Sequence, residues 1–339
     1  MTAGPHRSTS IGVAARVLAV ASALALAGCG SSGAPVASST AAPPATSPVT
    51  PATGTPPASI AASPPPASTG PASLAPFLVV KGDILFNDLS TEEVDAIAPD
   101  GTNRRQLTNV PGLDWMATLS PDGRRIAWSS DPGNGRDIYV MNADGSSVQR
   151  LTGNDFHSYH PSWAPSNDHL VFGAAETQEL FEIAADGSGE VRISAKMDSH
   201  PEWSPDGKHI VFMRGPEEGH DIYVADADGS NARRLTTDPK DDQIPVWSPD
   251  GRLIAFTRGS GDERDIWVMN ADGSNQKALK TNRLSGGPSY WPSYSRDGSS
   301  IAFTRDASAT SPDVWIMNAD GTNPRPLTTT GHDWGPRWG

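Results

Sequence analysis

Short apolar runs separated by polar turn residues recur along this chain. One set follows a turn and reads HIVFM, LIAFT and SIAFT, at residues 209–213, 253–257 and 300–304. A second set precedes another turn and reads DIYVM, DIYVA and DIWVM, at residues 137–141, 221–225 and 265–269. These runs are too short for helices, and Gly, Pro and Asp bound them. Their consecutive β-branched and aromatic residues predict strands that are covered on both faces.

Three landmarks recur six times each, 40 to 48 residues apart. The first is a large apolar residue before a turn, here called the slot, at Leu119, Trp163, Trp203, Trp247, Tyr294 and Trp338. The second is an Asp-Gly turn whose glycines are Gly101, Gly145, Gly187, Gly229, Gly273 and Gly321. The third is a Leu-Thr pair or its variant, beginning at Leu107, Leu151, Ile193, Leu235, Leu279 and Leu327. Periods of this length indicate an array, a solenoid or a propeller.

The turns predict two hairpins in each repeat. Ser-Pro-Asp-Gly follows three of the slots, Leu119, Trp203 and Trp247, and in it proline fixes one φ while glycine supplies a positive φ. Asn-Ala-Asp-Gly provides the second hairpin. The third unit has Ala164-Pro165-Ser166-Asn167 instead. Asparagine tolerates positive φ next best after glycine, so this turn is expected to persist.

Each repeat is therefore a four-stranded antiparallel meander, with strands A, B, C and D in chain order. Such a unit has two apolar faces and needs neighbours on both sides, as in a β-propeller. The first repeat starts with a B strand at residues 83–87, and the chain ends with an A strand at residues 335–339. The predicted fold class is all-β: a six-bladed propeller over residues 77–339, closed by its C-terminal strand.

These repeats resemble the TolB-type, WD40-like propeller repeat, which also occurs in relatives of prolyl oligopeptidase. The resemblance covers about residues 82–339. The sequence has no Gly-x-Ser-x-Gly elbow, so the peptidase activity of those relatives is not implied. TolB carries an α/β domain ahead of its propeller, whereas the corresponding stretch here has a different composition.

The first 76 residues differ from the rest of the chain. Residues 17–27 form an apolar run behind Arg7 and Arg16, which is the length of a secretory signal core. The run ends in Leu-Ala-Gly-Cys29, which resembles the lipobox of bacterial lipoproteins. That resemblance implies a signal peptide over residues 1–28 and a lipid on Cys29, the only cysteine in the chain. A single cysteine leaves no disulfide and no Cys-based metal site.

Residues 29–76 contain no charged residue and are dominated by Ala, Pro, Ser and Thr. Such a segment buries too little apolar surface to offset its chain entropy, so we expect a disordered tether. The chain as a whole has a formal net charge of −13, and every acidic residue follows residue 76. This balance argues against nucleic acid and anionic lipid headgroups as partners. Contact with the membrane is expected through the lipid alone.

Function is expected on the face that holds the D–A and B–C connections, because the turns of the other face are nearly identical. Counted back from the slot, position −5 holds Asp114, Ser158, Asp198, Asp242, Ser289 and Asp333. Position −4 holds Trp115, Tyr159, Ser199, Gln243, Tyr290 and Trp334. Position −3 holds Met116, His160, His200, Ile244, Trp291 and Gly335. Equivalent positions of a propeller form rings, so these side chains are expected to converge at one mouth of the central channel.

Two interpretations of these rings are open. Aspartates at a bend cap backbone amides, and aromatic residues fill the seams between blades. Alternatively, carboxylates and flat aromatic rings bind sugars or peptide amines. The predicted ligand-binding residues are Asp114, Trp115, Tyr159, His160, Asp198, His200, Asp242, Gln243, Tyr290, Trp291, Asp333 and Trp334.

A metal site is a separate possibility. His160 and His200 occupy matching positions of adjacent repeats, and His157 and His332 lie at position −6. This set resembles, in type and place, the channel-mouth histidines of oligogalacturonate lyase, which implies a metal-dependent lyase or hydrolase acting on an acidic polysaccharide. We assign no metal ligand, cofactor or catalytic residue on this basis.

One further expectation concerns ion pairs. Arg214, Arg258 and Arg305 end B strands and face the aspartates that begin the C strands, which predicts cross-strand pairs with Asp221, Asp265 and Asp313. The chain as a whole is interpreted as a monomeric, extracytoplasmic, lipid-anchored binding module. Its expected partner is a cell-envelope protein or glycan, bound at the D–A face.

Overall fold

The computed structural model describes residue 79 and residues 81–339, except residues 110–111, 134, 154–155, 195–196, 217–218, 280, 282–286 and 307–310. The predicted signal peptide, the tether and Cys29 lie outside the described residues. Among the residues it does describe, no helix is long and apolar enough to cross a membrane.

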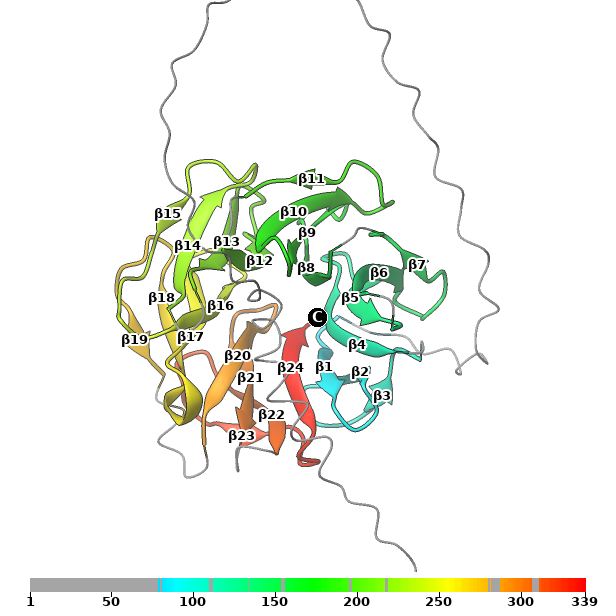
Figure 1. Ribbon diagram of the computed structural model, residues 1–339. Coiled ribbons are helices and arrows are strands. Elements are labelled where there is room, and N and C mark those ends of the chain that lie inside the picture. Colours follow the sequence, from blue (N-terminus) through cyan, green and yellow to red (C-terminus); the bar gives the residue numbers. More distant parts are fainter. Residues whose placement is uncertain are drawn as a thin grey trace, which may run out of the picture.

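Six four-stranded antiparallel sheets are arranged around a common axis (Figure 1). Blade 1 contains β24, β1, β2 and β3, and blades 2 to 6 contain the remaining strands in chain order. The innermost A strands are β4 Leu113–Leu119, β8 Ser158–Trp163, β12 Asp198–Trp203, β16 Asp242–Trp247, β20 Ser289–Tyr294 and β24 Asp333–Trp338. The B strands are β1 Ile84–Asp88, β5 Arg125–Asp131, β9 His169–Ala174, β13 His209–Arg214, β17 Leu253–Arg258 and β21 Ser300–Asp306.

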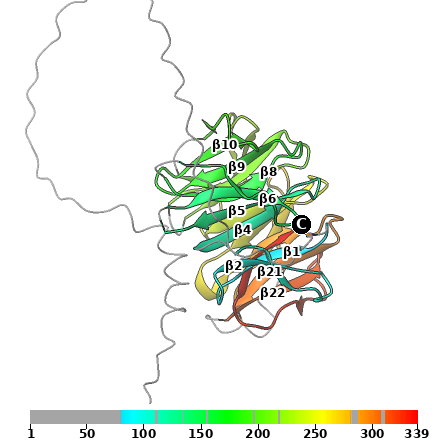
Figure 2. The same ribbon diagram turned by 90° about the vertical axis from the view of Figure 1, so that its right-hand side faces the viewer.

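The C strands lie farther out, and the D strands at the rim are two residues long. The C strands are β2 Glu93–Ile97, β6 Asp137–Asn142, β10 Glu179–Ala184, β14 Asp221–Asp226, β18 Asp265–Asn270 and β22 Pro312–Asn318. The D strands are β3 Arg105–Gln106, β7 Gln149–Arg150, β11 Val191–Arg192, β15 Arg233–Arg234, β19 Lys277–Ala278 and β23 Arg325–Pro326. A 3₁₀ turn, Gly261–Glu263, precedes β18. In the side view the stacked blades form one thick disc (Figure 2).

The prediction that the C-terminal strand closes the ring is confirmed. Strand β24 pairs antiparallel with β1, with Leu85 opposite Arg337 and Asp88 opposite Asp333. The red β24 accordingly lies beside the blue β1 in Figure 1. Strands from the two ends of the sequence therefore share blade 1.

The turn chemistry also agrees with the prediction. Gly123, Gly207, Gly251 and Gly298 end the A–B turns with φ near +70 to +78°, and Asn167 takes the same place in blade 3 at φ +67°. The amide of Asn167 donates to the carbonyl of Ala164 at 2.9 Å, so the variant turn is closed like the others.

The Leu-Thr landmark follows each D strand and ties it to the C strand. In blade 2 the hydroxyl of Thr152 accepts from the Ile138 amide at 2.9 Å and donates to Asp137 at 2.9 Å. Matching threonine bonds occur in the blades of Thr108, Thr236 and Thr328. This hydroxyl replaces ladder bonds that a two-residue strand lacks.

Hydrophobic core lies between the blades. Each B strand contributes one fully buried aromatic residue, namely Phe86, Trp128, Phe172, Phe212, Phe256 and Phe303. The cluster between blades 2 and 3 is typical, since Ile138 and Leu151 of one blade pack with Trp163 and Phe172 of the next. Because every core is shared, a blade is stable only beside its neighbours.

Candidate functional site

Every A strand has a β-bulge at position −3. Residues at this position have positive φ, and they are Met116 (+56°), His160 (+53°), His200 (+52°), Ile244 (+55°), Trp291 (+59°) and Gly335 (+64°). The register of each A–B pair shifts at this point, so two A-strand residues oppose one B-strand residue. Five of the six are not glycine, and such a conformation costs about 1–3 kcal/mol each. Bulges of this kind re-aim side chains.

These bulges place aromatic rings against one another across the channel. His160 of blade 3 stacks on Trp291 of the opposite blade 6, with ring centroids 5.1 Å apart and an interplanar angle of 22°. His200 contacts His160 at 3.8 Å and Trp291 at 5.5 Å. Trp291 meets Trp334 edge to face at 5.4 Å. We call these four residues the aromatic mouth, and they close the channel on the D–A face.

Both histidines of the mouth are held neutral by their surroundings. Burial, together with the nearby His220 and Arg337 charges, lowers the pKa of His200 to about 3. Burial and the neighbouring His200 lower the pKa of His160. The Nδ1 atoms of both rings are buried without a hydrogen-bond partner among the described residues. Two neutral rings with unused nitrogens form a polar centre inside an apolar stack.

A buried ion pair lies beneath the stack, on the side of the A–B turns. Glu202 and Arg337 occupy position −1 of the opposite blades 4 and 1, and their Oε2 and Nη1 atoms are 2.6 Å apart. Glu202 also accepts from the Trp247 amide of blade 5 at 3.1 Å. Burial raises the pKa of Glu202, while Arg337 opposes that shift. Sequence reasoning missed this pair, although charged residues at an otherwise small or apolar position were a usable signal.

The aspartates at position −5 are completely buried. Asp198 forms a two-pronged pair with Arg214 at 2.5 and 2.8 Å, and Asp242 does so with Arg258 at 2.6 and 2.7 Å. Asp333 is held by Arg104 through two bonds of 2.9 Å. Each of these three carboxylates is fully buried against a guanidinium, so none of them is open to a ligand.

The predicted cross-strand ion pairs of Arg214 and Arg258 are wrong, although the register is as expected. Arg214 lies opposite Asp221 in the ladder, yet its guanidinium turns to Asp198 on the A strand. Asp221 is instead paired with Arg234 of the D strand at 2.5 Å. The reason is burial: the fully buried A-strand aspartate has the greater need of a charge partner.

Asp114 differs from the other aspartates of its ring. The ladder position opposite it holds Ser130 rather than arginine. Its buried carboxylate is near the side chains of Ser130, Thr108, Trp128 and Glu93, which act to lower its pKa, and none of these four carries a positive charge. Its neighbour Glu93 of blade 1 is bound by Thr108 at 2.6 Å. Burial, together with the nearby Asp114 and Asp95 carboxylates, raises the pKa of Glu93 to about 7, and burial raises that of Asp114 to about 6.

The side chains at position −4 are mostly buried or already in contact with other side chains, so only part of this ring can meet a ligand. Trp115 is 8% exposed and lies 4.1 Å below the guanidinium of Arg136, and Tyr159 is 4% exposed. Tyr290 is half-buried and stacks with Arg264 at 4.6 Å. Gln243 is half-buried and donates to Asp241 at 2.6 Å.

The four predicted histidines do not all meet. His157 is 48% exposed and pairs with Glu176 at 2.8 Å, and His332 is exposed. Across the described residues, no group of three or more His, Cys, Asp or Glu side chains is arranged to hold a metal ion. His160 and His200 contact each other through their rings.

The surface on offer to a ligand is therefore chiefly aromatic. Trp291, Trp334 and Tyr290 are half-buried, so part of each ring faces solvent. Met197, beside the mouth on a D–A connection, is 39% exposed. A floor of tryptophan and tyrosine rings over neutral histidines suits an apolar or aromatic group carrying one hydrogen-bond donor or acceptor. That these residues bind a ligand stays a prediction.

Comparison with known proteins bears on the whole propeller. Residues 188–339 match the family described as the TolB beta propeller domain. The chain is 33% identical over 111 residues to the Protein TolB homolog of Chlorobaculum tepidum, covering 32% of this chain and 25% of that protein. It is 36% identical over 73 residues to the Tol-Pal system protein TolB of Geobacter sulfurreducens, covering 22% and 17%. The matched stretches thus span a quarter or less of these relatives.

Solved structures share the fold at low identity. TolB from Acinetobacter baumannii superposes with a TM-score of 0.64 and 20% identity, covering 76% of this chain and 66% of that one. Oligogalacturonate lyase from Vibrio parahaemolyticus gives 0.50 and 15%, covering 73% and 74%. At these identities the likeness concerns the fold alone.

Proposed function

Because this chain is a TolB-type β-propeller protein, we propose that it is a cell-envelope binding module that recognises a partner protein at its aromatic mouth. One matched relative is by its name a protein of the Tol-Pal system, which supports an envelope setting and a protein partner. The module is expected to act as a monomer, anchored through a lipid on Cys29.

The observation that carries the proposal is the half-buried Trp291–Trp334 pair, whose ring centroids are 5.4 Å apart. Trp291 also packs against both histidines. Strained backbone holds this pair in place, since Trp291 has a φ of +59°. Strain that recurs in every blade at one end of the channel points to a positioned surface. Exposed tryptophan and tyrosine are the residue types that dominate binding energy at protein interfaces.

The path of the chain supports presentation of this surface. The amide of Val79 donates to Ala143 in a C–D turn at 3.0 Å, and Gly82 donates to Gly339 at 3.0 Å. The chain therefore enters the propeller on the face of the A–B and C–D turns. A tether to the membrane at that side leaves the D–A face directed away from the bilayer.

Site-specific photo-crosslinking in intact cells tests this proposal. A photoreactive residue at Gln243, on the rim of the mouth, is expected to give a discrete protein adduct. The same residue at Asp228, in a turn on the other face, serves as the matched control. Trp334→Ala should remove the Gln243 adduct while the protein stays folded. Adducts from Asp228 with none from Gln243 would contradict the proposal, and a glycan adduct in place of a protein would replace the partner class.

A further inference from the structure

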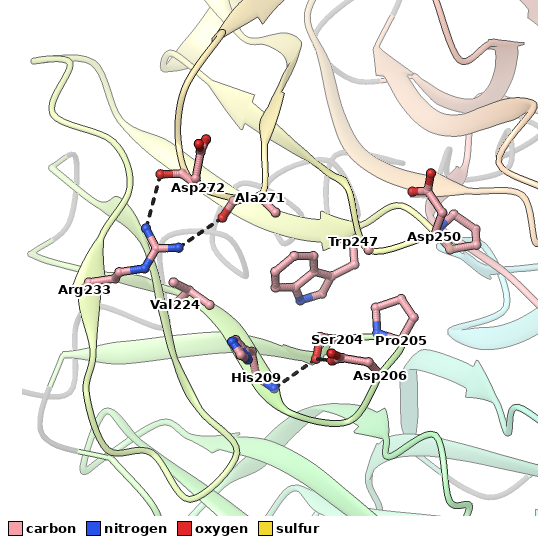
Figure 3. A pocket seen from close by; sticks show the side chains of 12 residues that line it. Ser204, Pro205, Asp206, His209, Val224, Arg233, Trp247, Asp250, Ala271 and Asp272 are labelled. Carbon is pink, nitrogen blue, oxygen red and sulfur yellow. Dashed lines mark hydrogen bonds between the residues drawn. The ribbon is translucent and has the colours of Figure 1, made fainter.

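A groove opens on the opposite face, between blades 4 and 5. Its volume is about 550 Å³, within the range of about 300–1,000 Å³ common for ligand sites. The A–B turns of the two blades form its walls, with Pro205 on one side and Pro249 on the other. The indole of Trp247 lies in its centre (Figure 3). Arg233 closes the outer end by donating to the carbonyls of Asp272 and Ala271 at 3.2 and 3.3 Å.

One difference between repeats distinguishes this groove from the seam between blades 2 and 3. Between blades 2 and 3 the slot residue Trp163 is covered by Arg125, whose guanidinium lies 4.7 Å from the ring. The Trp163 indole also donates to the Thr118 carbonyl at 3.3 Å. Between blades 4 and 5 the position of Arg125 is taken by His209, because both residues begin their B strands. The shorter imidazole leaves space above Trp247 that Arg125 fills above Trp163.

The floor of the groove offers unused polar atoms. The Trp247 side chain is buried, with only 8% of the residue exposed. Its Nε1 has no hydrogen-bond partner among the described residues. The Nδ1 of His209 is likewise buried and unpartnered. A buried indole N–H without a partner costs free energy, which a ligand carbonyl recovers. Figure 3 shows the indole nitrogen on the edge that faces Val224 and His209.

The rim of the groove is acidic. Asp206, Asp250 and Asp272 line it, and Arg233 is its single basic lining residue. Hydrogen bonds from their own turns lower the pKa of all three aspartates, first among them the bonds from Ser204, Ser248 and Ser274. Those bonds use the Oδ1 atoms. The exposed Lys208 and Arg252 side chains lie 3.7 and 3.8 Å from the Oδ2 atoms of Asp206 and Asp250, and such exposed pairs are weak enough for a ligand cation to compete with them.

We infer that this groove binds an extended peptide carrying a lysine or arginine, supplied by another protein. The charge complementarity of the rim selects the basic side chain, the Trp247 indole N–H meets a backbone carbonyl, and the two proline rings flank the peptide. The chain's own residues 29–76 contain no charged residue, so they lack the group that the rim selects. This surface is separate from the aromatic mouth and does not depend on the function proposed for it.

The test uses the full chain with ¹⁵N-labelled tryptophan indoles, titrated with an acetylated and amidated heptapeptide, Ala-Pro-Ala-Lys-Ala-Pro-Ala. The Trp247 indole signal, assigned with Trp247→Phe, is expected to shift saturably. The Trp163 signal is the internal control and should not move, because its N–H is already bonded. Replacing the peptide lysine by glutamine, or Asp250 by asparagine, should each weaken binding about five-fold, as expected for one partly exposed charge pair of about 1 kcal/mol.

Further control titrations show whether a shift of the Trp247 signal comes from the peptide backbone and its lysine together, and from this groove. Lysine amide alone should shift Trp247 far less than the heptapeptide, and an uncharged peptide of residues 44–66 should not shift it. Trp334→Ala should leave the titration unchanged, which separates this site from the mouth. An equal response to the glutamine peptide, a response at Trp163, or no shift at Trp247 up to millimolar peptide would overturn the inference. Asp250→Asn lies in an exposed turn, so it tests the charge without the core damage of Trp247→Phe.

Discussion

Glu202 and Arg337 meet across the channel axis, with 2.6 Å between Oε2 and Nη1 and side chains that are only 17% and 18% exposed. They come from opposite blades, and Arg337 belongs to the strand that closes the ring. The pair therefore joins the closing strand to the far side of the propeller. A buried ion pair of this kind is poor evidence of net stabilisation, but losing one member leaves an uncompensated charge.

Replacing Arg337 by methionine should therefore lower the free energy of unfolding by about 3–5 kcal/mol. Chemical denaturation at neutral pH measures this. The double variant Arg337→Met with Glu202→Gln should recover a large part of the loss, because no buried charge remains. If the double variant is as unstable as the single one, the pair does not act through charge.

Asp114 and Glu93 predict a pH dependence with a defined sign. Their pKa values in the folded protein are raised to about 6 and 7, above about 3.9 and 4.3 in an unfolded chain. The folded state then binds more protons between about pH 4 and 7, so stability falls as pH rises through that window. Asp114→Asn should reduce this fall by on the order of 2 kcal/mol, since Glu93 is only half-buried and coupling limits the effect. Thermal melts at pH 5 and pH 8 compare the two proteins.

Asp242→Asn is the matched control at the same ring position. It removes the buried carboxylate that bridges Arg258, which is 4% exposed, and leaves only the more distant Asp238 at 3.7 Å as a counter-charge, so it should cost about 3–5 kcal/mol at both pH values. Two aspartates in one ring would thus respond oppositely at pH 8. Equal destabilisation by both substitutions would refute the assignment of Asp114 as a carboxyl lacking a counter-charge.

Removing residues 334–339 should open the ring. The deletion takes most of β24 from β1 and exposes the core of blade 1. The loss should exceed the roughly 0.5–3 kcal/mol of an ordinary point substitution. Moving residues 329–339 ahead of residue 81, joined through Ser-Pro-Asp-Gly, should restore the melting temperature. A truncated protein that melts like the intact one would contradict closure by β24.

The fold could be predicted almost completely from the sequence because each blade repeats the same turn chemistry. The Ser-Pro-Asp-Gly and Asn-Ala-Asp-Gly turns set the hairpins, and the unpaired strands at the two ends set the closure. The site was harder, because ring positions specify which side chains converge but not what they bond to. The partner of Asp198 depends on which way Arg214 turns, and the ladder register alone does not decide that.

The bulge at position −3 has a sequence signal of its own. Proline follows this position in five of the six blades, as in His160-Pro161 and Trp291-Pro292, and proline inside a strand marks a bulge. The groove of Figure 3 had no such signal. It lies between His209 of one blade and Trp247 of the next, and only the structure shows how these two side chains are placed.

The central claim is that a partner covers the aromatic mouth in the cell envelope. Hydroxyl-radical labelling followed by mass spectrometry tests it most directly, on intact cells and on the purified protein in parallel. Trp291 and Trp334 report on the mouth, and the half-buried Trp267 and Trp315 on the outer strands β18 and β22 are same-residue controls. The account predicts that Trp291 and Trp334 are protected in cells while the controls are labelled equally in both samples. Equal labelling of all four tryptophans in cells and in the purified protein would contradict it.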